Sequence, residues 1–180
     1  DMFCKREGCV KDGDTGDVAC DHYYRYKEDV GIMKEIGLKA YRMSVSWPRV
    51  IPDGFGQVNE KGLDFYDRLV DELLRCGITP YITLFHWDYP YELYKRGGWL
   101  NPDSPKWFQE YTKVVVDRLS DRVTNWMTLN EPQCFIILGH YDGAHAPGLK
   151  LDKNDLFLMI HNSLLAHGRS VEAIRKYSKK

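Results

Sequence analysis

The feature that most constrains this chain is a threefold alternation between short apolar runs and longer amphipathic segments. The apolar runs have the length of β-strands and cover residues 39–47, 79–87 and 122–129. Each is followed by a loop and by a segment with helical periodicity, and these segments cover about residues 60–76, 104–119 and 153–177. Strands that alternate with helices predict parallel βα units, so we expect a single α/β domain. Its three units cover roughly residues 38–76, 78–120 and 122–177, behind a loop over residues 1–20.

Residues that favour helix ends mark the boundaries of the helical segments. Asp21 precedes a further helical pattern that runs to about Ile36, and its side chain is expected to cap the first turn. Ser104 followed by Pro105 predicts another start, with the serine as the cap and the proline at the first helical position. In the last helix, five apolar residues at helical spacing are expected to face the core: Leu156, Ile160, Leu164, Val171 and Ile174.

Composition and charge exclude several classes of function. The chain has 25 Lys and Arg against 26 Asp and Glu, so it lacks the basic surface of a nucleic-acid-binding protein. No apolar run is long enough to span a bilayer, and no secretory signal is visible. Five cysteines without metal-ligand spacing predict no metal site, and no cofactor is expected. A Cys4–Cys9 disulfide is conceivable, but reduced thiols in the cytoplasm fit better, with Cys76 and Cys134 as packing residues.

Polar and aromatic side chains stand at the end of each expected strand. The first strand ends at Trp47, the second at His86 and Trp87, and the third at Asn130 and Glu131. Because the C-terminal ends of parallel strands form one rim, where such folds carry their chemistry, we expect these residues to lie together. Each could instead be structural, with Trp47 as packing, His86 as a satisfied strand-end imidazole and Glu131 as the cap of the next element. Their coincidence at one rim favours a site.

Glu131 is the candidate catalytic group. It follows an apolar strand and precedes Pro132, which has no N–H and therefore ends the hydrogen bonding of that strand. Burial at the lip of a sheet disfavours the charged carboxylate, so we expect the pKa of Glu131 to be raised. A raised pKa suits a general acid that works near neutral pH.

The residue types at this rim suit a sugar. Aromatic rings stack on the C–H faces of a sugar, while amide, imidazole and carboxyl groups bond its hydroxyls. Glu131 could protonate a glycosidic oxygen. Arg42 lies in the first strand, where a buried arginine requires an anionic neighbour. That neighbour would be a second carboxylate, although a purely structural ion pair is the alternative.

Four segments together resemble glycoside hydrolase family 1, the β-glucosidase family. They are residues 41–49 (YRMSVSWPR), 83–90 (TLFHWDYP), 97–99 (GGW) and 128–132 (TLNEP). The resemblance extends over essentially the whole chain. It departs mildly from the family pattern at Tyr24, where the family usually has His, and at Met43, where it often has Phe.

The resemblance implies a (β/α)8 barrel and a retaining mechanism in which Glu131 is the acid/base. It also implies that His86 and Asn130 bind hydroxyls of the glycone and that Trp87 lines the same subsite. Arg42 is then expected to lie against the nucleophile.

A complete barrel needs far more than 180 residues, so the resemblance implies an N-terminal-half segment with barrel strands two to four. The Thr-Glu-Asn-Gly segment that carries the family nucleophile is absent. Retention needs two carboxyl groups only about 5 Å apart, and Asp88, although close to His86 in sequence, is not the nucleophile of the family. We therefore expect this segment to act on β-glucosides or short cello-oligosaccharides only with the remainder of the barrel, and to be inactive alone.

The alternative hypothesis is a non-catalytic partial barrel. Its unpaired outer strands would expose hydrogen-bonding edges that attract other chains, and it would bind sugars or another protein. Under either hypothesis no nucleic acid and no membrane is expected as a partner.

Overall fold

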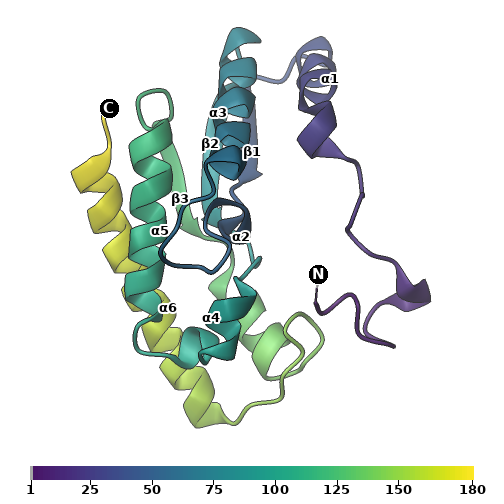
Figure 1. Cartoon of the computed structure of the whole chain (residues 1–180), viewed down its shortest axis with the longest axis vertical. Helices are drawn as coiled ribbons and strands as arrows, with labels where there is room; N and C mark the ends of the chain where they lie inside the picture. The colour runs from purple at the N-terminus through teal and green to yellow at the C-terminus, as the bar shows by residue number, and fades with distance from the viewer. Residues whose placement is uncertain (1) are drawn as a thin grey trace.

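The computed structural model describes residues 2–180 as a three-stranded parallel sheet with helices packed against it (Figure 1). The strands are β1 (Ala40–Ser44), β2 (Thr79–Phe85) and β3 (Asn125–Leu129). The α-helices are α1 (His22–Glu35), α2 (Trp47–Val50), α3 (Glu60–Arg75), α4 (Tyr91–Lys95), α5 (Ser104–Leu119) and α6 (Lys153–Tyr177). Shorter elements are the 3₁₀ turns Lys11–Gly13 and Gly98–Leu100 and the π-helical turn Cys134–Leu138.

The alternation of strands and helices expected from the sequence is confirmed. Helix α3 connects β1 to β2, α5 connects β2 to β3, and α6 follows β3. Strand β2 lies in the centre, where Tyr41 of β1 pairs with Pro80 on one side and Trp126 of β3 pairs with Ile82 on the other. Within residues 2–180, the outer edges of β1 and β3 have no neighbouring strand.

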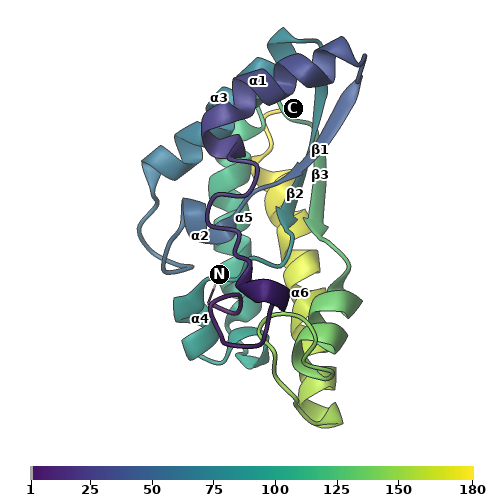
Figure 2. The same ribbon diagram turned by 90° about the vertical axis from the view of Figure 1, so that its right-hand side faces the viewer.

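The core lies between the sheet and helices α3 and α5, which run along one side of it (Figure 2). Fully buried residues of the two helices and of β2 fill this layer: Leu69, Val70, Leu73, Phe108, Val115, Ile82 and Leu84. Tyr111 of α5 donates its hydroxyl to the carbonyls of Val45 (3.0 Å) and Leu84 (2.9 Å). A single buried hydroxyl therefore joins α5 to the ends of β1 and β2 and holds these two strand ends beside each other.

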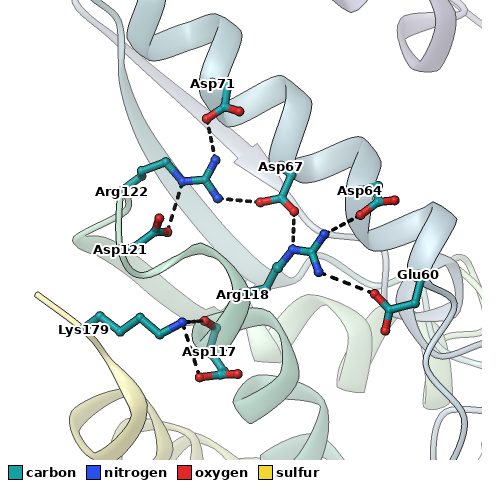
Figure 3. Close-up of polar contacts among 9 residues, drawn as sticks. All are labelled: Glu60, Asp64, Asp67, Asp71, Asp117, Arg118, Asp121, Arg122 and Lys179. Carbon is teal, nitrogen blue, oxygen red and sulfur yellow. Dashed lines mark hydrogen bonds and ion pairs between the residues drawn. The ribbon is translucent and has the colours of Figure 1, made fainter.

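An ion-pair network joins α3 to the end of α5 (Figure 3). Arg118 contacts Glu60, Asp64 and Asp67, and Arg122 contacts Asp67, Asp71 and Asp121. Four of these carboxylates recur every three or four residues along α3, so they form one row on a single helix face. Asp67 is shared by both arginines and is the least exposed of the carboxylates, with a side chain 17% exposed.

The strands are shorter than the sequence predicted. The first ends at Ser44 rather than Trp47, because the carbonyls of Ser46 and Trp47 accept the N–H groups of Val50 and Ile51 as the chain turns into α2. The third begins at Asn125 rather than residue 122, because the N–H groups of Arg122 and Val123 close the end of α5 by donating to Leu119.

One predicted helix cap is right only in its position, and the other is wrong. Asp21 is the N-cap residue of α1, as predicted, but it has a φ of +55° and its side chain makes no capping bond. Ser104 is the first residue of α5 and not its cap, which is Asp103. By contrast, α6 covers the predicted residues 153–177. It is capped by the carboxyl of Asp152, a cap that was not predicted, which accepts the N–H groups of residues 154 and 155.

The predicted core face of α6 is wrong at two of its five positions. Ile160 and Leu164 are 39% and 60% exposed, whereas Leu156 and Ile174 pack against the core as predicted and Val171 is partly buried. The buried face is instead made mainly of small and polar residues: Met159, Asn162, Ser163, Ala166, Ser170 and Ala173. The short side chains let α6 lie close against α5, where the hydroxyls of Ser170 and Thr112 are 2.9 Å apart.

Residues 2–20 form the exposed loop that the sequence predicted, interrupted only by the 3₁₀ turn Lys11–Gly13. All five cysteines are free thiols, so the Cys4–Cys9 bridge is not formed. Among residues 2–180, no helix combines the length and apolarity needed to cross a bilayer, and no cluster of three or more His, Cys, Asp or Glu could hold a metal ion.

Candidate active site

The candidate residues follow the strand ends at one rim of the sheet. The N–H of Asn130 donates to the carbonyl of Phe85 (2.9 Å), which keeps the chain after β3 beside the end of β2. His86 and Trp87 follow β2 directly, and Glu131 follows Asn130. Trp87 and Glu131 have positive φ angles of +82° and +41°, so the chain turns sharply at both residues as it leaves the sheet.

A chain of hydrogen bonds connects all three strands at this rim. Arg42 of β1 donates through Nη2 to Oδ1 of Asn130 (2.6 Å) and through Nε to Oγ1 of Thr83 in β2 (3.0 Å). The amide nitrogen of Asn130 lies 3.3 Å from Nε2 of His86. The amide of Asn130, itself only 8% exposed, therefore orients Arg42 and His86 together.

The predicted pairing of Arg42 with the nucleophile stays a prediction, because that carboxylate is expected outside this segment. The burial expected for Arg42 is not found among the described residues. Its side chain is exposed, and its hydrogen-bond partners are the neutral groups of Thr83 and Asn130. Among residues 2–180, no carboxylate oxygen lies within 4.0 Å of its guanidinium. Arg42 thus presents a positive charge at the rim that the described residues do not neutralise.

Trp87 is held by its indole nitrogen. Nε1 donates to the carbonyl of Asn130 (2.9 Å), and the ring centroid lies 5.1 Å from that of His86 and 5.6 Å from that of His145. The indole is partly buried and leaves part of its face open at the rim. His145 was not identified from the sequence, because it lies in an irregular loop far from the strand ends along the chain.

Glu131 lies at the rim, and its side chain is exposed. The sequence predicted a buried carboxyl at this position, but the described residues do not bury it. Its carboxyl accepts a hydrogen bond from Sγ of Cys134 at 3.3 Å. The pKa of His86 is lowered by burial and then by Arg42, whereas the charge of Glu131 opposes that shift. Electrostatic coupling thus exists between the imidazole and the carboxylate across this rim.

Trp47 does not belong to the site. It is fully buried, stacks on Tyr111 with centroids 5.0 Å apart and donates Nε1 to the carbonyl of Gly54 (3.1 Å). The packing alternative was therefore the right one for this residue. Asp88, next to Trp87, is partly buried, and desolvation raises its pKa to about 6 against the opposing hydrogen bond from Ser46.

Two hollows adjoin the rim. One, of about 380 Å³, is lined by Arg42, Thr83 and His86 and opens along β1. The other, of about 300 Å³, lies on the far side of Trp87 and is lined mainly by aromatic rings. Asn130 and Glu131 line neither hollow. The rim itself combines an aromatic face, an amide, an imidazole, a guanidinium and an exposed carboxylate, which are groups able to bind a polyhydroxylated ligand and transfer a proton to it.

Comparison with known proteins identifies the family. The sequence model described as Glycosyl hydrolase family 1 matches residues 1–180. The chain is 53% identical over 174 residues to beta-glucosidase A of Thermotoga maritima, covering 97% of this chain and 39% of that protein. It is 54% identical over 174 residues to the 1,4-beta-D-glucan glucohydrolase of Thermotoga neapolitana, covering 97% of this chain and 41% of that protein.

The fold agrees with solved structures. The structure of the Thermotoga maritima beta-glucosidase in complex with glucoimidazole matches with a TM-score of 0.96 and 52% identity, over 99% of this chain and 40% of that one. The three-stranded parallel sheet and its helices are therefore a partial (β/α)8 barrel. The chain spans about 40% of the length of these relatives. It belongs to glycosyl hydrolase family 1.

Proposed function

We propose that these residues are the segment of a retaining β-glucosidase that supplies the acid/base Glu131 and part of the glycone subsite. The activity is hydrolysis of terminal β-D-glucosidic bonds. The observation that carries the proposal is the hydrogen-bonded chain Arg42–Asn130–His86, which joins three strand ends directly beside Glu131.

The glycone subsite is formed by three residues with complementary groups. His86 and Asn130 supply a ring nitrogen and an amide for sugar hydroxyls, and Trp87 supplies an apolar face for the C–H groups of the ring. The hydrogen bonds from Trp87 to Asn130 and between Asn130 and His86 support this role, because they hold the three side chains in one relative orientation before a ligand arrives.

In the reaction, Glu131 gives its proton to the glycosidic oxygen as the bond breaks and later takes a proton from the attacking water. Its exposed carboxyl at the rim supports this role, since a leaving-group oxygen can reach it from solvent. The second carboxyl group of a retaining pair would stand about 5 Å away and come from the remainder of the barrel. Arg42, which has only neutral partners here, would lie against that nucleophile.

The activities named for the relatives support the substrate class. Two are a beta-glucosidase and a 1,4-beta-D-glucan glucohydrolase, and a structure similar to this chain carries glucoimidazole. We therefore assign β-glucosides and short cello-oligosaccharides as substrates. The free thiols support a reducing location such as the cytoplasm, which fractionation of the source cells would test.

The experiment compares the 180-residue chain with a chimera in which it replaces the equivalent segment of the Thermotoga maritima enzyme. Both are assayed with 4-nitrophenyl β-D-glucoside. We expect turnover by the chimera and none by the chain alone. Turnover by the isolated chain would contradict the assignment of the nucleophile to other residues, and a folded but inactive chimera would contradict the assignment of Glu131.

The second candidate function is a non-catalytic partial barrel that binds sugars or another chain. Its support is the open edges of β1 and β3 within residues 2–180. A monodisperse oligomer of the 180-residue chain that binds glucose and cleaves no glucoside would favour it. Aggregation of the lone chain would count against it.

A further inference from the structure

The turn after β3 brings a thiol to the carboxyl of Glu131. The N–H of Cys134 donates to the carbonyl of Glu131 (2.9 Å), and Sγ of the same residue lies 3.3 Å from Oε2 of Glu131, donating to it. Cys134 therefore contacts Glu131 through both its backbone and its side chain. Within residues 2–180, the thiol is the hydrogen-bond donor that reaches this carboxylate.

The backbone that carries the thiol is anchored. Cys134 begins the π-helical turn Cys134–Leu138, and the next residue, Phe135, is buried with its ring against Phe85 (5.2 Å) and Trp99 (5.5 Å). Phe85 is the last residue of β2, directly before His86. The thiol is thus fixed to the same strand end that carries the glycone residues, whereas Glu131 itself is exposed.

The electrostatics of the contact keep the thiol in its donor form. The hydrogen bond to Glu131 is the main cause of a raised pKa for Cys134, so near neutral pH the residue is S–H and can donate. The other charged or titratable groups of the described residues around this rim are His86 at the end of β2, Arg42 of β1, His145 beside Trp87 and Asp88, which follows Trp87. Of these, His86 couples directly to Glu131.

We propose that Cys134 is a positioning residue, whose S–H group orients the carboxyl of Glu131 and supports its ionised form. The inference rests on the proposed function of Glu131 as the acid/base. In the retaining sequence, Glu131 is ionised after it has protonated the leaving group and before it accepts a proton from water. A donor held at its Oε2 favours the carboxylate in that interval and leaves Oε1 free to face the substrate.

The first test does not require catalysis. Alkylation of each cysteine of the 180-residue chain by iodoacetamide is followed near neutral pH by peptide mass spectrometry, with and without Glu131→Gln. Removing the charge should raise the alkylation rate of Cys134 about threefold or more, because more of it becomes thiolate. Cys76, whose thiol lies 4.0 Å from Glu72 on α3, is the control and should not change. An unchanged rate at Cys134, or an equal increase at both cysteines, would overturn the contact.

The second test measures the pH–rate profile of the chimera described above. Cys134→Ala should lower kcat/KM for glucosides with poor leaving groups about two- to tenfold, the usual range for one hydrogen bond, and move the alkaline limb to higher pH. Cys134→Ser, which retains a donor, should restore both. Equal losses in the two variants with an unmoved limb would show a packing role and overturn the inference. An inactive parent chimera would instead contradict the proposed function, and the alkylation experiment would still test the contact.

Discussion

The arginines of this chain occupy two contrasting environments. Arg118 and Arg122, at the end of α5, each contact three carboxylates, most of them from a single face of α3 (Figure 3). Arg42, at the rim of the sheet, has only the neutral oxygens of Thr83 and Asn130 as partners. In the network, several carboxylates neutralise the charge of the two arginines. At the rim, the charge of Arg42 remains free to pair with an anionic group from outside the described residues.

The contrast extends to the backbone. The carboxylates of the network project from regular turns of α3, but Trp87 and Glu131 at the rim have positive φ angles, which cost side-chain-bearing residues of the order of 1–3 kcal/mol each. At the rim, the unneutralised charge of Arg42 therefore occurs together with local backbone strain. In the network, the paired charges occur on a regular helix. Under the proposed function, this difference separates a region of binding and chemistry from a region of structural pairing, and each prediction tests one of the two.

The largest effect is expected from Glu131→Gln in the chimera. Loss of the transferable proton should lower kcat/KM for cellobiose about 10²–10⁴-fold, the range typical of general acid catalysis. The loss should be much smaller for 2,4-dinitrophenyl β-D-glucoside, whose leaving group departs without protonation. Steady-state kinetics with both substrates measure the difference.

The matched control for this substitution is Glu60→Gln, which removes a carboxylate of the same type from the network. It should leave both rates unchanged, since Glu60 lies on α3 and contacts only Arg118 there. Equal losses for good and poor leaving groups in the Glu131 variant would show that Glu131 does not donate the proton.

Arg42→Met should change the pH dependence of the chimera. A guanidinium beside a carboxylate lowers the pKa of that carboxylate by about 1–3 units, so its removal should raise the pKa of the nucleophile. Because the nucleophile must be ionised, the acidic limb of kcat/KM against pH should move upward by a similar amount. Arg118→Met is the control and should leave this limb in place. A stationary limb in the Arg42 variant would mean that the free charge at the rim does not pair with the nucleophile.

Asp88 is intermediate between the two regions, as a partly buried carboxyl whose pKa is raised to about 6 by desolvation. An aspartate in an unfolded chain titrates near 3.9, so the folded state binds the proton more tightly between about pH 4 and pH 6. The contribution of Asp88 to stability should therefore be lost as pH rises through this window, by up to about 2–3 kcal/mol. Urea unfolding of the wild type and Asp88→Asn should show a difference that grows over this window in favour of the variant and then levels off.

The control for Asp88 is Asp53→Asn, which changes an exposed carboxyl in the loop before α3. Its unfolding free energy should follow the wild type at all pH values. A pH-independent difference for Asp88→Asn would mean that solvent reaches the carboxyl in the folded chain.

Much of the fold could be predicted from the sequence, because the alternation of strand and helix patterns is a local property of the chain. The limits of α6 were predicted correctly for this reason. Its buried face was predicted only in part, because exposed Ile160 and Leu164 have the helical spacing of core residues, while Ser163 and Ser170 are buried only through close packing against α5. The early end of β1 depends on the turn into α2, where the carbonyl of Ser46 accepts the N–H groups of Arg49 and Val50, and the apolar run up to Trp47 does not reveal this turn.

For the candidate site, the sequence predicted that His86, Trp87, Asn130 and Glu131 lie at one rim, because strand ends converge in a parallel sheet. It did not predict the exposure of Arg42, since burial of a residue on an outer strand depends on what lies beyond that strand. The thiol contact of Cys134 was also missed. The sequence shows only that Cys134 lies three residues after Glu131. This spacing indicates a contact only once the chain is known to turn at Glu131.

The smallest effect tests the network itself. Asp67 bridges Arg118 and Arg122 with a side chain 17% exposed, while the side chains of the two arginines are 38% and 25% exposed. Because solvent screens much of this attraction, Asp67→Asn should lower the free energy of unfolding by only about 1 kcal/mol, and by less in 0.5 M salt. The chimera carrying it should retain the kinetics of the parent, unlike the variants at the rim.

The control is Asp121→Asn, which removes a half-exposed carboxyl that contacts Arg122 alone. Since a single exposed ion pair contributes little, its unfolding free energy should lie within about 0.5 kcal/mol of the wild type. If Asp67→Asn changed the free energy of unfolding as little as Asp121→Asn, the row of carboxylates on α3 would add no stability beyond that of single ion pairs. Arg118 and Arg122 would then differ from Arg42 in their contacts but not in their contribution to stability. If instead only Asp67→Asn lowered the free energy of unfolding, and salt reduced that loss, the partly buried carboxylate shared by Arg118 and Arg122 would be the one that stabilises the fold.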